Sequence, residues 1–291
     1  MIYSSLKKKK NELLLSAPPI GWLLIFFIIP TILVIAMAFR SADPYGGIGD
    51  RWTLDTIMDL RNPNYPLIIW RTVWLSIVST VICILTAIPA SYYISRIRKK
   101  YQDIILLLII VPFWINFLIR IFAWKVFLHP EGIFKQTLVA LHIANPDSLL
   151  LYRPGAVLVV IIYSYLPFAL LPIYAAAEKF DFHLMEAAYD LGASRFQAFT
   201  RVFIPGIRQG LLTAIIVVFI PALGSYVIPD IVGGPSAEMI GNRIAQRTFI
   251  DRNLPHASAL SALLTFAVII PAALALTRRF FKEKNSGSLG I

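Results

Sequence analysis

The sequence predicts an all-α polytopic membrane protein with six transmembrane helices, and three observations lead to this fold class. Hydrophobic residues make up 58% of the 291 residues and charged residues only 15%, and the mean hydropathy is +0.72. Such values are rare in a soluble domain of this size. Long stretches without any charge recur along the chain, and the basic residues gather at the ends of these stretches. About 20 apolar residues cross a bilayer core about 30 Å thick, so each stretch is a candidate span.

The first three spans are predicted at residues 17–39, 71–96 and 104–127. The first apolar run is longer than the about 7–15 residues of a signal-peptide core, so we expect an uncleaved span, although Ala36-Met37-Ala38 resembles a cleavage site. A polar loop precedes the second span, and a short basic turn at 96–101 separates the second span from the third.

The last three spans are predicted at residues 153–178, 209–229 and 254–277, after a polar loop at 129–153. The charged stretch 178–208 and an external loop at 230–253 separate them. The chain is therefore expected to be a single transmembrane domain over residues 1–291, at a length that leaves no room for a second large domain.

The distribution of lysine and arginine predicts the orientation of the chain. The amino terminus with Lys7–Lys10, the turn 96–101, the stretch 178–208 and the short tail after residue 277 hold more than half of the 27 basic residues. Short cytoplasmic loops carry such an excess, so both termini and the 178–208 stretch are expected on the cytoplasmic side. The net charge of +11 could also indicate nucleic-acid binding, but basic clusters at span ends fit membrane orientation better, and no nucleic-acid partner is expected.

Residues 178–208 predict two short helices joined by a corner. One small, apolar helix face is formed, at helical spacing, by Leu184, Ala187, Ala188 and Leu191. Gly192 stands where a helix ends in a left-handed residue, and Ser194 with Gln197 has the spacing of a capping box. Pro205 should end the second helix or bend it into the next span. An amphipathic connector lying on the bilayer surface would have a similar pattern.

The order of residues in this stretch is more specific than its periodicity. Glu186-Ala187-Ala188, three residues, Gly192, nine residues, Val202, a spacer and Ile204-Pro205 resembles the EAA loop of ABC-importer permease subunits. The family pattern has Ile in place of Val202 and Leu-Pro in place of Ile204-Pro205, and both differences keep shape and polarity. The resemblance implies a helix that docks into a groove of a separate ATPase. The residues implied in coupling to that ATPase are Glu186, Ala187, Ala188, Gly192 and Ser194.

The resemblance also implies the partners and the place of the chain. A homodimeric ABC ATPase would bind the 178–208 stretch, and an extracytoplasmic solute-binding protein would deliver cargo. A second permease subunit would complete the pathway, either a second copy of this chain or, as the polyamine members of the family imply, a paralogue. The chain would lie in the lipid of the bacterial inner membrane. No Gly-x-x-x-x-Gly-Lys-Ser/Thr loop occurs in the sequence, so the chain itself is not expected to be an enzyme or to bind a cofactor.

A second set of residues resembles one subgroup, the spermidine/putrescine permeases, over a core of about 70–277. The matching runs are Pro112–Asn116, Leu118–Arg120, Gly224–Gly234, Met239–Asn242, Arg252–Pro255 and Ala257–Ala259. The subgroup implies a polyamine cargo, although related permeases carry other small solutes. Ammonium groups favour carboxylates and aromatic faces, so the candidate cargo contacts are Trp114, Tyr226 and Asp230. A capped turn for Asp230, and packing or lipid contact for Trp114 and Tyr226, are the alternatives.

Other readings of the sequence have less support. Arg120 would stand about 24 Å along a straight helix from Ile104, near the outer interface, where its charge could snorkel or pair with a partner subunit. An ion-coupled secondary transporter would need carboxylates within the spans, which are almost free of them. No metal-ligand spacing occurs among the four histidines, Cys83 is alone, and the spans contain no catalytic constellation.

Overall fold

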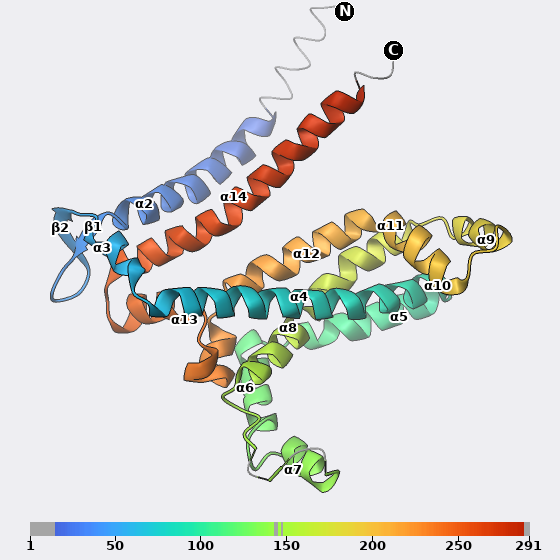
Figure 1. Cartoon of the computed structure of the whole chain (residues 1–291), viewed down its shortest axis with the longest axis horizontal. Coiled ribbons are helices and arrows are strands. Elements are labelled where there is room, and N and C mark those ends of the chain that lie inside the picture. The colour runs from blue at the N-terminus through green and yellow to red at the C-terminus, as the bar shows by residue number, and fades with distance from the viewer. Residues whose placement is uncertain (1–14, 143–144, 147, 288–291) are drawn as a thin grey trace, which may run out of the picture. The chain divides into compact units, whose positions relative to one another are not determined.

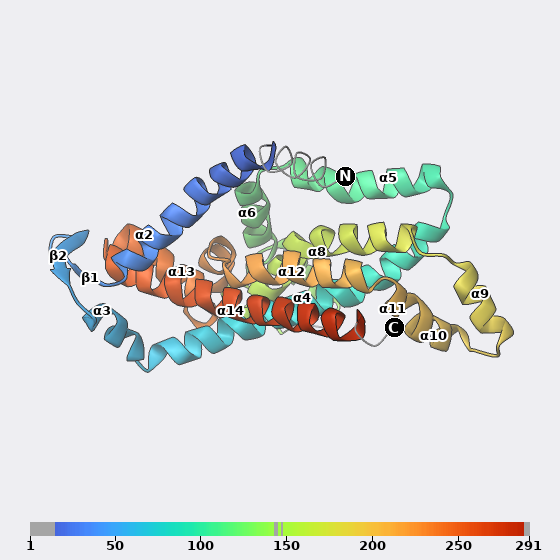
Figure 2. The same cartoon turned by 90° about the horizontal axis from the view of Figure 1, so that it is seen from above.

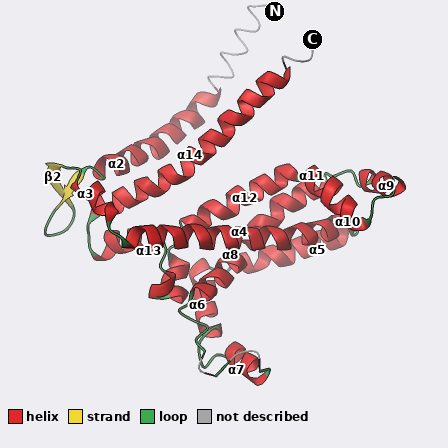
Figure 3. Ribbon diagram, in the orientation of Figure 1, coloured by secondary structure: helices red, strands yellow, loops and turns green. Residues whose placement is uncertain are grey.

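The structure is a computed structural model that describes residues 15–142, 145–146 and 148–287, of which 271–287 are described by their backbone only. The basic amino terminus with Lys7–Lys10 lies outside the described residues. The chain divides into two compact units, residues 64–243 and a second unit formed by 1–63 with 244–291. Figure 3 shows that most of the described chain is helical, with one pair of strands.

The unit that joins both ends of the chain contains the first predicted span. A helix covers Leu15–Met37, with a π-helical turn η1 (Leu24–Ile28) followed by α2 (Ile29–Met37), close to the predicted 17–39. α2 packs against α14 (Leu254–Gly287), which extends beyond the predicted end at residue 277. An antiparallel hairpin of β1 (Arg40–Ala42) and β2 (Ile48–Trp52) follows α2. The remaining helices of this unit are α3 (Asp55–Met58), η2 (Asp59–Arg61) and η7 (Gln246–Ile250).

Three long helices, α4 (Asn64–Arg96), α8 (Pro154–Glu178) and α12 (Arg208–Leu223), form the core of the other unit (Figure 1). α8 matches its predicted span, whereas α4 begins seven residues before the predicted start at Arg71. Gly210 permits the close approach of α12 to α8, because a Cβ there would lie 2.5 Å from the carbonyl oxygen of Pro172. Buried hydroxyls on α4, such as Thr72 and Ser76, donate to backbone carbonyls one turn earlier, and these hydrogen bonds offset the cost of removing the hydroxyls from water.

The predicted continuous third span is wrong. α5 (Lys99–Ile110) and the short η3 (Val111–Trp114) are separated from α6 (Phe117–Phe127) by an 89° bend. The helix continues through Pro112, and the break comes at Ile115, which is extended. The Asn116 side chain then accepts a hydrogen bond from the Leu118 N–H and starts a new helix. The height of 24 Å estimated for Arg120 assumed a straight helix and therefore does not hold.

The predicted fifth span and external loop also differ from the structure. α12 ends at Leu223 instead of Pro229, and the stretch predicted as a loop contains η5 (Pro229–Gly233), η6 (Pro235–Ala237) and α13 (Ile240–Ala245). Within the 224–243 segment, Ile228, Val232 and Met239 are fully buried. The Ile240 N–H donates to the Thr72 hydroxyl at 2.9 Å, which fixes this segment to α4. The polar loop predicted at 129–153 contains α7 (Ile133–Ala140).

Three helices of the described chain are long and apolar enough to cross a membrane: Leu15–Met37, α4 and α8. Two bent pairs, α5 to α6 and Arg195–Gly206 to α12, reach the same criterion if each pair counts as one span. The apolar part of α14, Leu254–Ile270, is shorter. The described helices therefore supply between three and five long apolar elements.

Candidate docking segment

The 178–208 segment forms a compact group of short helices beyond the ends of α4 and α8 in both views (Figures 1 and 2). The helices are α9 (His183–Asp190), α10 (Arg195–Ala198), the π-helical η4 (Phe199–Phe203) and α11 (Ile204–Gly206). A 70° bend at Ile207 separates Arg195–Gly206 from α12. The predicted order of helix, corner, helix and proline bend is confirmed.

The corner is built by hydrogen bonds within the segment. Gly192 has φ of +84°, and its N–H donates to Tyr189 while the N–H of Ala193 donates to Ala188, both at 2.9 Å. These two bonds form a Schellman motif, which closes a helix through a left-handed residue. On the far side, the Ser194 hydroxyl accepts from the Gln197 N–H, and the Gln197 side chain accepts from the Ser194 N–H. The Ser194 side chain is thus used to start α10.

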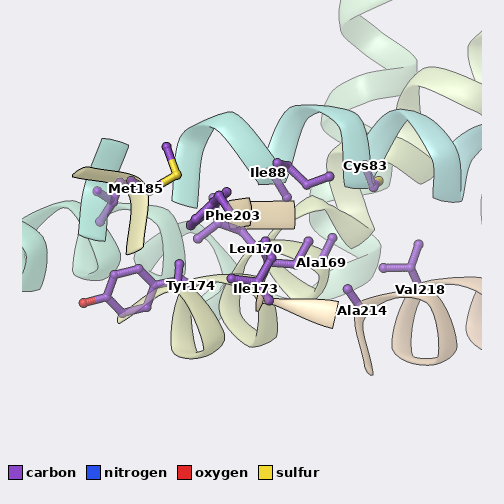
Figure 4. Packing of buried hydrophobic residues seen from close by; sticks show 14 of the residues in the cluster. Cys83, Ile88, Ala169, Leu170, Ile173, Tyr174, Met185, Phe203, Ala214 and Val218 are labelled. Atoms are coloured by element: carbon purple, nitrogen blue, oxygen red, sulfur yellow. The ribbon is translucent and has the colours of Figure 1, made fainter. Parts of the chain in front are cut away.

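Buried side chains fix the segment to the helix bundle. Met185, Ala198 and Phe203 lie in one hydrophobic cluster with residues of α4, α8 and α12, and Figure 4 shows Met185 and Phe203 beside Ile88 and Leu170. The ring of Tyr92 on α4 lies with its centroid 4.9 Å from that of Phe203 in an edge-to-face arrangement. Aromatic pairs of this kind add about 0.5–1.5 kcal/mol beyond their buried area. The base of the segment is therefore a rigid part of the core.

The tip of the segment has the opposite character. Leu184 is 52% exposed, Leu191 is 88% exposed, and Phe196 at the start of α10 is 76% exposed. Ala187 is also exposed, whereas Ala188 is half-buried. Leu184, Ala187 and Leu191 of the predicted apolar face therefore point away from the fold, whereas Ala188 lies on the inward side with Met185. Phe182, Met185 and Ala188 recur at a spacing of three and form the inward face. This spacing is visible in the sequence, but it does not by itself distinguish the inward face from the exposed one.

The side chain of Glu186 is exposed, and among the described residues its ion pair is with His183, one turn back. Its Oε2 lies 3.1 Å from Nδ1 of His183. The Glu186 carboxylate raises the pKa of His183, first by this hydrogen bond and then by its charge. Because both side chains are mostly exposed, a polar group of a partner protein can replace His183 as the partner of Glu186 at little cost.

A cavity of about 660 Å³ lies beside the segment. It is lined by Pro89, Tyr92, Tyr93, Arg96, Tyr189, Arg195, Phe196 and Phe199. The Arg96 guanidinium donates to the Tyr92 hydroxyl at 2.7 Å and lies over the rings of Tyr92 and Phe182. The cavity therefore lies between the exposed tip and the end of α4, and its walls are largely aromatic.

The candidate cargo residues are only partly brought together. The Asp230 N–H donates to the Tyr226 carbonyl at 3.0 Å, so these two residues lie one helical turn apart on one face, and both side chains are exposed. Trp114 is 77% exposed in η3. Within the described residues, no side-chain hydrogen bond, ion pair or ring contact joins Trp114 to the other two.

Comparison with known proteins decides the family. The sequence model of the family described as "Binding-protein-dependent transport system inner membrane component" matches residues 84–282. The chain belongs to this family of ABC-importer permeases. The permease is thus a subunit of a transporter in the inner membrane and not a catalytic enzyme.

Relatives of the permease share most of its length. It is 38% identical over 245 residues to the spermidine/putrescine transport system permease protein PotB of Haemophilus influenzae, covering 84% of this chain and 86% of the relative. PotB of Escherichia coli is 32% identical, with 86% and 90% covered. The inner membrane ABC transporter permease protein YdcU of Escherichia coli is 28% identical, with 91% and 88% covered.

Solved structures show the same fold at lower identity. A chain of a bacterial ABC transporter that imports the acidic polysaccharide alginate has a TM-score of 0.67 and 21% identity, with 100% of the permease and 99% of that chain covered. A chain of a bacterial alginate ABC transporter in complex with an alginate pentasaccharide-bound periplasmic protein has a TM-score of 0.69 and 21% identity, with 96% of the permease and 97% of that chain covered. The permease therefore has the helical fold of a type I ABC importer.

Proposed function

We propose that this permease forms part of the pathway for polyamines such as spermidine and putrescine. The observation that carries the proposal is its 38% identity, over most of both chains, to a permease named for these cargoes. The placement of Tyr226 and Asp230 supports it, since an exposed carboxylate and an aromatic ring on one helical face fit an ammonium group. Trp114 is a separate candidate contact. A related small solute is the alternative cargo.

The 178–208 segment is the coupling element for a homodimeric ABC ATPase. A tip with exposed Leu184 and Leu191 on a base fixed by Met185 can enter an apolar groove and transmit a displacement without bending. Glu186 supplies a polar contact, Ala187 and Ala188 permit close approach, Gly192 sets the corner, and Ser194 holds the second helix in place. Hydrolysis then belongs to the ATPase, and this chain converts its movement into a change of access.

The proposed architecture is one transmembrane domain over residues 1–291 with six spans, a permease core at about 70–277 and both termini in the cytoplasm. The excess of basic residues on one side supports this orientation, and it places the coupling segment where ATP is available. A paralogous permease completes the pathway, and an extracytoplasmic solute-binding protein delivers the cargo, as the family description of a binding-protein-dependent system supports.

The cargo is tested by reconstituting the complete transporter in lipid vesicles. Spermidine and putrescine, each with the solute-binding protein, should stimulate ATP hydrolysis and enter the vesicles, whereas an acidic solute should do neither. Asp230→Asn should weaken stimulation by spermidine without changing basal hydrolysis. Stimulation by an unrelated solute alone would overturn the polyamine proposal, and uptake on an ion gradient without the ATPase would favour a secondary transporter.

The coupling surface is tested by replacing exposed apolar residues with serine. Leu191→Ser should reduce retention of the ATPase on the purified permease, because it removes apolar surface from the contact. Ile133→Ser is the matched control, since Ile133 on α7 is 79% exposed but lies outside the 178–208 segment. Equal retention in both variants would place the ATPase elsewhere.

A further inference from the structure

Arg120 on α6 has no anionic partner within the part of the chain that the structure describes. Its guanidinium lies 4.3 Å from the ring centroid of Phe113 and 5.7 Å from that of Phe117, and its Nε and Nη1 are buried without a hydrogen bond. Among the described residues, Arg120 takes part in none of the ion pairs. The aromatic faces attract the cation but leave its charge uncompensated.

An uncompensated cation at this place is unfavourable. α6 is half of a bent apolar element that is long enough to cross a membrane, and a charge in such an element is rare unless it pairs or faces water. A charge that is partly removed from water without a partner is unfavourable, so a half-buried guanidinium with two buried, unpaired nitrogens is expected to find its counter-charge in an assembly. Arg120 therefore indicates an incomplete site.

A cavity of about 420 Å³ lies at Arg120. Its lining residues are Ile115, Ile119, Arg120, Ala123, Trp124, Phe127 and Tyr163. Arg120 is the one charged residue among them, and its third nitrogen, Nη2, is not among the buried unpaired atoms. An incoming group would meet apolar and aromatic walls and a single cationic donor. This chemistry fits one carboxylate carried on an otherwise apolar segment.

We infer that this cavity receives a carboxylate side chain from a membrane-spanning helix of the second permease subunit. The surface around it fits a helix, since Leu118, Ile119 and Phe122 on α6 are exposed and apolar. A phospholipid phosphate is the other anion that a single guanidinium could meet here, and the crosslinking experiment below distinguishes it from a partner helix. The inference rests on the proposed two-subunit pathway and not on the identity of the cargo.

The partner is a paralogue and not a second copy of this chain. No aspartate or glutamate occurs in this sequence between Arg71 and Arg96, between Arg153 and Glu178, or between Gln209 and Pro229. The core helices α4, α8 and α12 of a second copy could not supply a carboxylate from their interior. For this reason the occupant that we assign is a chain of different sequence, with a carboxylate inside one of its long helices.

A photo-crosslinking amino acid at Ile119 tests the inference in the complete transporter, expressed in its native membrane. Ile119 lines the cavity and is 62% exposed. We expect an adduct with the paralogous permease that maps to a segment containing Asp or Glu. An adduct with phospholipid or with a second copy of this chain would overturn the inference.

Substitution of Arg120 provides a second measurement. Arg120→Met should reduce retention of the paralogous permease by about tenfold or more, because it leaves the partner's carboxylate buried and unpaired. The isolated variant should melt at the same or a higher temperature than the wild type, since an uncompensated charge has been removed. Arg120→Lys should retain the partner in part. Lys125→Met, on the same helix but outside the cavity lining, is the control and should change neither value.

The two results separate this inference from the proposed function. Full retention of the paralogue by Arg120→Met, with the control unchanged, would overturn the carboxylate pairing. Retention of the ATPase through the 178–208 segment is measured in the same samples and reports on the coupling proposal independently. If the cargo screen failed, retention of the paralogous permease and retention of the ATPase would still report on the two subunit contacts.

Discussion

The 178–208 and 224–243 segments both connect long helices through glycines of positive φ, yet they serve the molecule differently. Gly192 has no heavy atom within 4 Å of an added Cβ, whereas a Cβ on Gly234 would lie 2.9 Å from the Cβ of Tyr152. The first segment exposes apolar side chains at its tip, and the second buries Val232 and Met239 completely. The 224–243 segment packs against the rest of this chain and is part of its core. The 178–208 segment exposes apolar side chains to solvent and is therefore available to a partner.

The largest expected effect comes from placing the same alanine at both glycines. Gly234→Ala should lower the free energy of unfolding by about 3 kcal/mol or more, because backbone strain adds to the clash with Tyr152. Gly192→Ala should cost only about 1–2 kcal/mol, the backbone term alone. Denaturant unfolding in detergent measures both. Equal losses would mean that the surroundings of the two corners do not differ in solution.

A pair of adjacent residues tests the boundary between base and tip. Met185→Ala should cost about 2–3 kcal/mol, because it leaves a cavity at a position only 3% exposed. Leu184→Ala should stay within about 0.5 kcal/mol, as is usual for an exposed position. The same unfolding measurement applies to both, and a reversed order would show that α9 is rotated about its axis.

A β-branched residue at the open corner should separate stability from function. Gly192→Val should lose about 2–3 kcal/mol of stability, more than alanine, because a β-branched residue is strained at positive φ. Assembly should stay largely intact, since no heavy atom lies within 4 Å of an added Cβ. The altered path of the backbone should nevertheless move the tip, so ATP hydrolysis continues while uptake falls. Reconstituted vesicles measure both rates. Uptake at the wild-type rate would contradict the role assigned to this corner.

The smallest expected effect concerns protonation at the tip. Glu186 raises the pKa of His183, so the stabilisation from this pair is fully present below the ordinary histidine pKa and is lost as pH rises through the raised value. In Glu186→Gln the pKa of His183 should fall toward its ordinary range. An NMR titration of the His183 ring measures the change, and high salt should reduce it in the wild type only.

The two segments also show how far the sequence alone could predict the structure. The corner was predicted correctly because its signals are local: Gly192 ends one helix, and Ser194 with Gln197 starts the next within four residues. The span at 153–178 was equally clear, since a charge-free run bounded by charged residues depends on composition only. The roles of the coupling and cargo residues stay predictions.

The errors arose where packing decides between alternatives that have the same apolar composition. Residues 104–127 have the hydropathy of one straight span, and only the capping residue Asn116 marked the break. The 224–243 segment was assigned to a loop for its glycines and prolines, but its place against Thr72 on α4 depends on contacts distant in sequence. The inward position of Met185 likewise depends on Phe203 and Tyr92, which no local pattern contains.

The 70° bend at Ile207 has a mechanical consequence for any load applied at α9. A force along the axis of Arg195–Gly206 acts nearly perpendicular to α12. Only a small component of this force is parallel to α12 and can make it slide along its own length. The close contact of Gly210 with Pro172 restrains α12 near that end and would act as a pivot. Loading α9 should therefore swing the far end of α12, at Leu223 and Gly224, through the widest arc.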